Sequence, residues 1–256
     1  EDIDLTYDIR AIAAELVGKG GEEALPSSKS QAKKWTDETR NRLSTWMASE
    51  ALPLVQKALE VEHLSATASI DPENSHLLRI DYEHTAAGTG YVKPVVLLEF
   101  GARSTGEPCD PIDVRCDAAA FMPDLEFPTS TPRVMKVERT FWEKATAVHV
   151  FCLGGKLRGE RFSRHWYDLC HLDSAGHAVA ALAMRDVADR VARHKSWFFV
   201  EKDAAGIVID YFAAVGGHLR LAPAEGTQRD ALAEDYDAML RDGLLLDDAT
   251  PFEQVL

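Results

Sequence analysis

The hydrophobic pattern of this 256-residue chain changes near Pro132, and this change constrains the fold more than any other feature. Before it, alternating apolar and polar residues typical of strands are mixed with helical segments. After about residue 134, only the helical period continues. We therefore expect an α+β fold in which residues 1–133 form a mixed sheet with flanking helices, and residues 134–256 form an all-helical half. The length suffices for one large domain or two modest ones.

The periodicity also predicts individual elements. In the first part it predicts a helix that Pro53 breaks or kinks, and a strand that begins just after Pro94. The strand-like runs are residues 1–5, 64–70, 76–84, 92–100 (with the strand itself starting after Pro94) and 111–116, and the expected helices are 9–16 and 30–61. In the second part the expected helices are 137–154, 163–172, 177–194 and 229–243, with Ser163 as the N-cap of the second.

The composition excludes several classes of protein. Four cysteines form no C-x-x-C pair, which argues against a zinc site or a redox dithiol and fits a cytoplasmic protein. No apolar run approaches the roughly 18 residues that span a bilayer. The acidic N-terminus does not resemble a signal peptide. We therefore expect no membrane partner.

The formal net charge of −14 argues against a broad, non-specific grip on nucleic acid. It leaves room for a local basic groove. One candidate is the run "GKLRGERFSRH", which contains Lys156, Arg158, Arg161 and Arg164, and another is "SKSQAKKW". The alternative is that both runs are solvated surface.

The chain opens with "EDIDL", in which acids alternate with aliphatic residues. In a strand, Asp2 and Asp4 project from one face, while Ile3 and Leu5 project from the other. Two adjacent carboxylates repel each other unless a cation lies between them. Mg²⁺ favours one or two carboxylates together with substrate phosphates, so the pair suits metal-assisted phosphoryl or nucleotidyl transfer. The alternative is an edge strand with an acidic outer face.

A third acid, Glu99, ends the apolar run "VVLLEF". Such a run is typical of a strand buried on both faces, where an acid is costly unless it is paired or bound to a metal. The alternative is simple exposure at the strand end.

Lys144 and Asp168 each border an apolar helical face. Lys144 adjoins the stripe of Phe141, Ala145, Val148 and Cys152, from which its ammonium group either snorkels into solvent or points into a cleft where it neutralises a phosphate. Asp168 follows Arg164 by four residues. It either forms a weak surface pair with Arg164 or projects toward the same cleft as Lys144.

Taken in order, the segments "EDIDL", "LLEFGARS", "VERTFWEKATAVH" and "FSRHWYDLCHL" resemble the AbiEii/AbiGii-type nucleotidyltransferase toxin family. "ARHKSWFF" and "DYDAML" are also similar to that family, so the resemblance covers nearly the whole chain. It implies a nucleotidyltransferase-like fold of the DNA polymerase β-like superfamily. It also implies a Mg²⁺-dependent enzyme of a toxin–antitoxin or phage-defence system.

The resemblance assigns roles to individual residues. Asp2 and Asp4 correspond to the metal-binding acid pair, and Glu99 stands where a third carboxylate is expected. Lys144 and Asp168 match the lysine and the second aspartate of the helical motifs. Arg158, Arg161 and Arg164 are expected to guide the acceptor toward the cleft.

Two departures from the family pattern stand out. His165 occupies the position of the first aspartate of the D-x-x-D motif. The glycine turn that holds nucleotide phosphates in the family precedes the acid pair, whereas here "GKGG" follows it. We therefore expect the sequence to be a piece of a longer chain that supplies this turn.

The expected function is transfer of a nucleoside monophosphate from an NTP to RNA, in particular to the 3′ end of tRNA, which blocks translation. A cognate antitoxin is the expected protein partner. Two alternatives remain open. One is a small-molecule nucleotidyltransferase, since the negative charge suits a cationic, antibiotic-like acceptor. The other is a member that binds nucleotide or a partner without catalysis.

Overall fold

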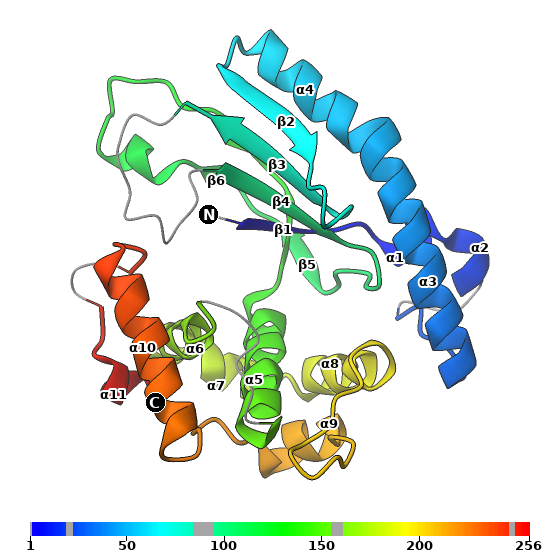
Figure 1. Ribbon diagram of the computed structural model, residues 1–256, viewed down its shortest axis with the longest axis vertical. Helices are drawn as coiled ribbons and strands as arrows, with labels where there is room; N and C mark the ends of the chain where they lie inside the picture. Colours follow the sequence, from blue (N-terminus) through cyan, green and yellow to red (C-terminus); the bar gives the residue numbers. More distant parts are fainter. Residues whose placement is uncertain (1, 19–22, 84–94, 155–160, 246–248) are drawn as a thin grey trace.

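The computed structural model describes residues 2–18, 23–83, 95–154, 161–245 and 249–256 (Figure 1). Its first part contains β1 (Asp2–Thr6), α1 (Ile9–Ile12), α2 (Ala14–Val17), α3 (Lys29–Trp46), the π-helical turn η1 (Met47–Ala51), α4 (Leu52–Val61), β2 (Ala66–Ile70), β3 (Leu77–Tyr82), β4 (Val95–Gly101), β5 (Cys109–Pro111), β6 (Val114–Arg115), the 3₁₀ turn η2 (Asp117–Ala120), β7 (Thr129–Ser130) and β8 (Arg133–Met135). The helical half contains α5 (Val137–Gly154), α6 (Arg164–Ser174), α7 (His177–Ala183), α8 (Arg185–Phe198), α9 (Tyr211–Ala213), η3 (Ala214–His218), α10 (Thr227–Arg241) and α11 (Phe252–Val255).

Four strands form a mixed sheet in the order β1-β4-β3-β2. β1 is parallel to β4, whereas β4 and β3, and β3 and β2, are antiparallel. Between β1 and its partner β4, the chain passes through α1, α2, α3, η1, α4, β2 and β3. The mixed sheet followed by helices confirms the expected fold class.

The α3–η1–α4 helix covers one face of the sheet (Figure 1). Its buried residues Leu43, Met47 and Ala51 pack with Ala68 and Leu78 of the sheet. Pro53 lies in the first turn of α4, directly after the π-helical turn. A proline has no N–H to continue the α-helical ladder, and a π-turn accommodates the missing bond. The helix therefore does not end at Pro53, as one form of the prediction had it; its irregularity is the π-helical turn just before this residue.

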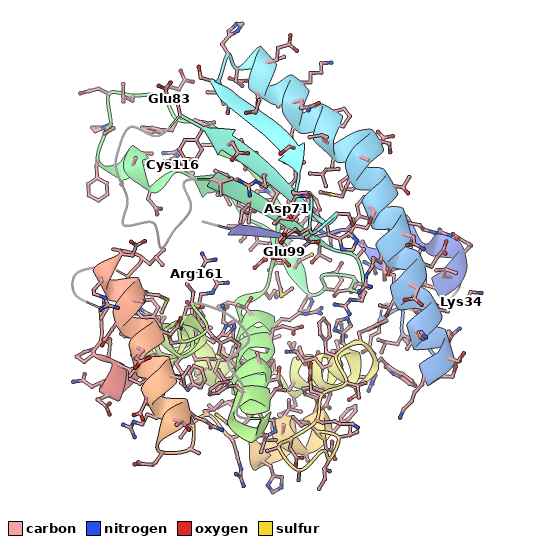
Figure 2. The ribbon with its side chains drawn as sticks, viewed as in Figure 1. Lys34, Asp71, Glu83, Glu99, Cys116 and Arg161 are labelled. Carbon is pink, nitrogen blue, oxygen red and sulfur yellow. The ribbon has the colours of Figure 1, made fainter. Side chains whose placement is uncertain are left out.

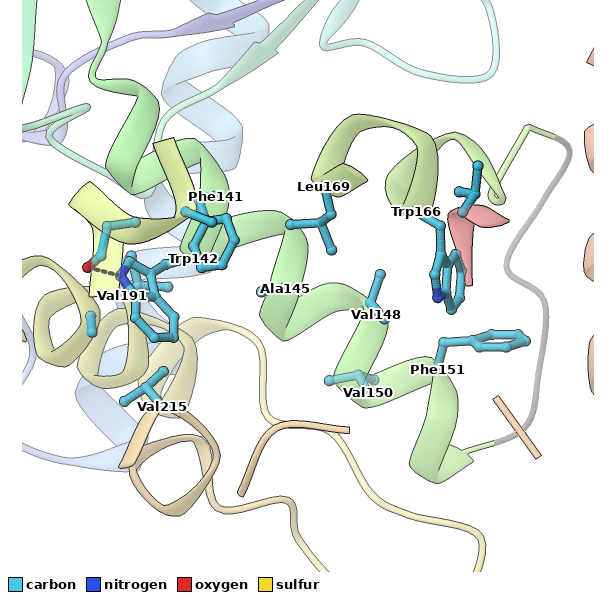
Figure 3. Packing of buried hydrophobic residues seen from close by; sticks show 14 of the residues in the cluster. Phe141, Trp142, Ala145, Val148, Val150, Phe151, Trp166, Leu169, Val191 and Val215 are labelled. Atoms are coloured by element: carbon cyan, nitrogen blue, oxygen red, sulfur yellow. Dashed lines mark hydrogen bonds between the residues drawn. The ribbon is translucent and has the colours of Figure 1, made fainter. Parts of the chain in front are cut away.

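The helical half lies beyond the β1 edge of the sheet (Figure 1). Its core surrounds α5, where Phe141, Ala145 and Val148 of the predicted stripe are buried and Cys152 is half-buried (Figure 3). Other faces of α5 are buried as well, which the stripe did not predict. Trp142 is 1% exposed, and its Nε1 donates a hydrogen bond of 3.0 Å to the carbonyl of Ala181. This bond satisfies the polar end of a large buried ring. The boundary between two domains at residues 133 and 134 stays a prediction.

Polar contacts and one small apolar cluster join the two parts. Arg139, at the start of α5, donates to Ser104 Oγ at 3.0 Å and to the carbonyl of Glu107. Phe198, at the end of α8, packs against Trp35 and Ile9. The loop after β4 is thus fixed against the helical half.

Several predicted elements differ from the structure. The helix expected at 9–16 breaks at Ala13, which is fully buried and has non-helical φ and ψ of −140° and 41°. The helix expected at 177–194 breaks at Met184 into α7 and α8. In both cases helical propensity is local, while tertiary packing sets where the chain turns.

Two further expectations are wrong in detail. The strand expected at 111–116 is divided between β5 and β6, which pair with β8 and β7 in two small antiparallel sheets that the sequence did not predict. β4 is mostly half-buried rather than buried on both faces. Within the described residues, no helix is long and apolar enough to cross a membrane.

Candidate active site

Two of the predicted acids are neighbours in the sheet. Asp4 of β1 and Glu99 of β4 are register partners in the parallel pair. Register partners project from the same face, and adjacent strands lie about 4.8 Å apart. Both residues are exposed. Asp2 lies in β1 opposite Leu97, and its side chain falls outside the described part of the structure.

The donor set of Asp4 and Glu99 fits a hard cation. Carboxylate oxygens are the ligands that Mg²⁺ prefers, and this ion commonly takes only one or two from the protein. Two adjacent carboxylates also gain from an intervening cation, because their charges otherwise repel. Among the described residues, no group of three or more His, Cys, Asp or Glu side chains is placed to hold a metal. The described pair therefore suits an ion shared with a substrate phosphate.

Asp4 and Glu99 line a pocket of about 320 Å³ at the carboxyl ends of β1 and β4. The other side of this pocket is formed by α3 and by the turn that precedes β3. These elements contribute the polar and basic side chains Thr36, Thr39, Arg40, Asn74 and His76, and the segment after β4 contributes Arg103. Its volume lies within the range of about 300–1,000 Å³ that is usual for small-ligand sites.

Lys144 and Asp168 form an ion pair between α5 and α6. The distance from Lys144 Nζ to Asp168 Oδ2 is 2.6 Å, and the two side chains are 26% and 33% exposed. This pairing contradicts the interpretation of Asp168 as the surface partner of Arg164. It also contradicts an ammonium group that simply snorkels into solvent. The ion pair brings the two residues together, and their projection into a common cleft stays a prediction.

His165 lies beside this pair. Burial, together with the nearby charges of Lys144 and Arg164, lowers the pKa of His165 to about 4. Its Nδ1 is buried and has no hydrogen-bond partner among the described residues. The position that carries an aspartate in the resembled family therefore holds a neutral imidazole at neutral pH.

The three arginines that were predicted to guide the acceptor lie in different surroundings. Arg158 lies outside the described residues. Arg161 has a φ of 63°, and its backbone N–H donates to Asp235 Oδ1 at 2.6 Å. Figure 2 shows Arg161 at the end of the helical half nearest the sheet, and Glu99 at the side of the sheet nearest the helical half. Arg164 is half-buried in the first turn of α6.

Ser163 does not cap α6, contrary to the prediction. Its backbone is already helical, and its Oγ donates to Asp235 Oδ2 at 2.6 Å. The backbone N–H of Ser163 donates to the same oxygen at 2.8 Å. Asp235 of α10 thus anchors the chain that leads into α6, and with it the backbone of Arg161. This aspartate lies about 70 residues downstream, so no local sequence signal reveals it.

The structure thus brings the candidate residues together as two pairs, Asp4 with Glu99 and Lys144 with Asp168. No hydrogen bond or ion pair within the described part of the chain joins one pair to the other. The sequence analysis missed Arg40 and Arg103, which line the same pocket as the acids. Arg103 stands in the quoted segment "LLEFGARS", but no periodic pattern distinguishes it, and Arg40 has no sequence signal at all.

Comparison with known proteins gives one match. The family model described as nucleotidyl transferase AbiEii toxin, type IV toxin–antitoxin system, matches residues 1–256. No curated protein and no solved structure matches the chain.

Proposed function

The chain belongs to the nucleotidyl transferase AbiEii toxin family of type IV toxin–antitoxin systems, and from this premise we propose that it transfers a nucleoside monophosphate from an NTP to RNA. The acceptor in this proposal is the 3′ end of tRNA, and its modification blocks translation. Family membership also implies a cognate antitoxin. The observation that carries the proposal is the pairing of Asp4 with Glu99 beside a pocket.

In this proposal Asp2, Asp4 and Glu99 hold Mg²⁺. When bound, the ion supplies charge neutralisation for the triphosphate and lowers the pKa of the acceptor hydroxyl. The carboxylates of the chain would hold the ion beside the α-phosphate, since without a cation they would repel it. The acceptor oxygen forms a bond to the α-phosphorus and loses its proton, while the bond from the α-phosphorus to the bridging oxygen breaks and pyrophosphate leaves.

Lys144 supplies a positive charge to the phosphates during this step. An ammonium group in a partly buried site stabilises developing negative charge more strongly than one in water. Asp168 is a positioning residue, because it acts through its 2.6 Å contact with Lys144 Nζ. This contact orients the Lys144 side chain before a substrate binds.

Arg158, Arg161 and Arg164 are proposed to contact the phosphates of the acceptor RNA. The support for Arg161 is its place at the end of the helical half that is nearest the sheet (Figure 2). The net charge of −14 favours a different acceptor, a cationic small molecule, and this is the second candidate function.

The experiment that tests the proposal is a labelling assay. Purified protein is incubated with each α-³²P-labelled NTP, Mg²⁺ and total bacterial RNA, and the products are separated on a denaturing gel. The test variant is Asp2→Ala with Asp4→Ala. The matched control is Asp124→Ala with Glu126→Ala, which removes the same charge from two exposed loop residues.

A labelled RNA band that the control retains and the test variant loses would support RNA nucleotidyl transfer and identify the nucleotide. Label that appears on an aminoglycoside and not on RNA would favour the second candidate. If no NTP labels any acceptor while nucleotide still binds, the protein is a binding-only member and the proposal is wrong.

A further inference from the structure

Two arginines, Arg40 and Arg103, line the same pocket as Asp4 and Glu99. Arg40 is exposed on α3, and Arg103 follows β4 by two residues. Both line this one pocket, and the charge of Arg40 adds to burial in lowering the pKa of Arg103. Within the described residues, neither guanidinium has a hydrogen bond or ion pair to a carboxylate.

This lack of an acid partner contrasts with a neighbouring arginine on the same helix. Arg42, two residues after Arg40, forms ion pairs with both Glu15 and Glu38. The chain has 42 acidic residues against 28 basic ones, so acids are abundant enough to pair a cation. Two cations in one pocket that form no ion pair with an acid repel each other in the isolated protein, and a bound anion reduces that cost in free energy.

Arg103 is held in place by contacts that do not neutralise it. Its Nη1 donates to the carbonyl of Phe198 at 3.2 Å, and its guanidinium carbon lies 4.3 Å from the ring centroid of Phe199. A guanidinium has five N–H donors in a rigid fork, and stacking leaves most of them available. Arg103 is therefore oriented before any ligand binds.

We propose that Arg40 and Arg103 bind the β- and γ-phosphates of the nucleotide, and that Asp4 and Glu99 lie at its α-phosphate. This inference rests on the proposed nucleotidyl transfer, and it adds a site for the pyrophosphate that leaves. Two cations match the several negative charges of a diphosphate portion better than the single charge of one RNA backbone phosphate. Guanidinium groups also match phosphate oxygens in geometry.

The test measures binding of inorganic tripolyphosphate by isothermal titration calorimetry, in the presence of EDTA. This ligand has no base, sugar or acceptor, and no metal is needed, so the result does not depend on turnover. The variants are Arg40→Gln and Arg103→Lys. The control is Lys34→Gln, which removes one positive charge from an exposed position of the same helix. Thermal unfolding checks that each variant is folded.

Arg40→Gln is expected to weaken tripolyphosphate binding about tenfold, which is the loss of one charge-assisted contact. Arg103→Lys is expected to weaken binding severalfold, because an ammonium group cannot form a bidentate contact. Lys34→Gln is expected to change binding less than twofold. A short RNA without a 5′ phosphate should bind Arg40→Gln and the wild type alike.

The proposal is overturned if tripolyphosphate does not bind the wild type, or if Arg40→Gln binds it as tightly as Lys34→Gln does. It is also overturned if Arg40→Gln weakens binding of the short RNA and leaves tripolyphosphate binding unchanged, since the arginines then contact nucleic acid. Tripolyphosphate binding that depends on Arg40, in a protein that labels no acceptor, would keep the phosphate site and reject the transfer reaction.

Discussion

Nζ of Lys144 lies 2.6 Å from Oδ2 of Asp168, and this ion pair connects the second turn of α5 to α6. The two side chains are neither fully buried nor fully exposed. A pair in this setting is less screened than a surface pair, and it orients the lysine. The first prediction concerns the roles of these two residues.

Lys144→Met is expected to lower nucleotidyl transfer about 100-fold or more, since a preorganised charge at the phosphates is lost. Asp168→Asn is expected to lower it less, because asparagine still accepts a hydrogen bond but no longer pairs the charge. The measurement is the rate of label transfer at saturating NTP. Asp173→Asn, at an exposed position of α6, serves as the control. A rate for Lys144→Met that matches the wild type would remove Lys144 from the mechanism.

The second prediction concerns the Asp4–Glu99 pair and its metal. EDTA is expected to abolish transfer, and added Mg²⁺ to restore it. Glu99→Gln is expected to lower the rate by about two orders of magnitude, since one carboxylate ligand is lost. The variant should also need more Mg²⁺ for half-maximal rate. Full activity of the wild type in EDTA would contradict a metal at these residues.

The third prediction concerns acid stability. The pKa of His165 is lowered to about 4, from a usual value near 6.5. Between these two pH values the unfolded chain binds a proton that the folded protein does not, so stability falls as the pH falls. The loss from this residue approaches roughly 3 kcal/mol at pH 4.

His165→Asn removes this group, so its free energy of unfolding is expected to fall less than that of the wild type between pH 6.5 and 4. Part of the fall remains, because burial also lowers the pKa values of His149 and His194. Urea unfolding at several pH values measures the difference. If the free energies of unfolding of the variant and the wild type change in parallel with pH, folding does not lower the pKa of His165.

The fourth prediction concerns the ion pair of the buried Lys195 with the half-buried Glu143. Lys195 is 9% exposed, and its Nζ lies 3.2 Å from Glu143 Oε2 and 2.9 Å from the Glu143 carbonyl. Burial by itself raises the pKa of Glu143, but Lys195, His194 and Arg139 outweigh it and hold that pKa below its usual value. Glu143 is therefore ionised and depends on its cationic neighbours.

Lys195→Met is expected to lower the free energy of unfolding by about 3 kcal/mol, because the carboxylate loses a buried partner. The control is Lys57→Met at an exposed position of α4, which should change stability by less than about 0.5 kcal/mol. Chemical denaturation at neutral pH measures both. Equal stability of the two variants would show that Lys195 contributes no more than a surface lysine.

Local patterns in the sequence were enough to predict many elements. The alternation of "EDIDL" predicted β1, and the apolar stripe of α5 predicted the burial of Phe141, Ala145 and Val148, although Cys152 of the same stripe is half-buried. These features depend on periods of 2 and 3.6 residues, which a short window of sequence contains. The resemblance added the family, which the match over the whole chain confirms.

Contacts between distant residues were decided only by the tertiary structure. The sequence placed Glu99 at a strand end, but the parallel register that sets it opposite Asp4 depends on how the chain returns through four α-helices, one π-helical turn and two strands. The break at Ala13, the anchoring of Ser163 by Asp235, and the placing of Arg40 and Arg103 in one pocket have the same origin. Each joins elements whose relative position is set by packing and not by local period. The sequence by itself therefore determined which residue types are available for the site, and the tertiary structure determined which of them meet.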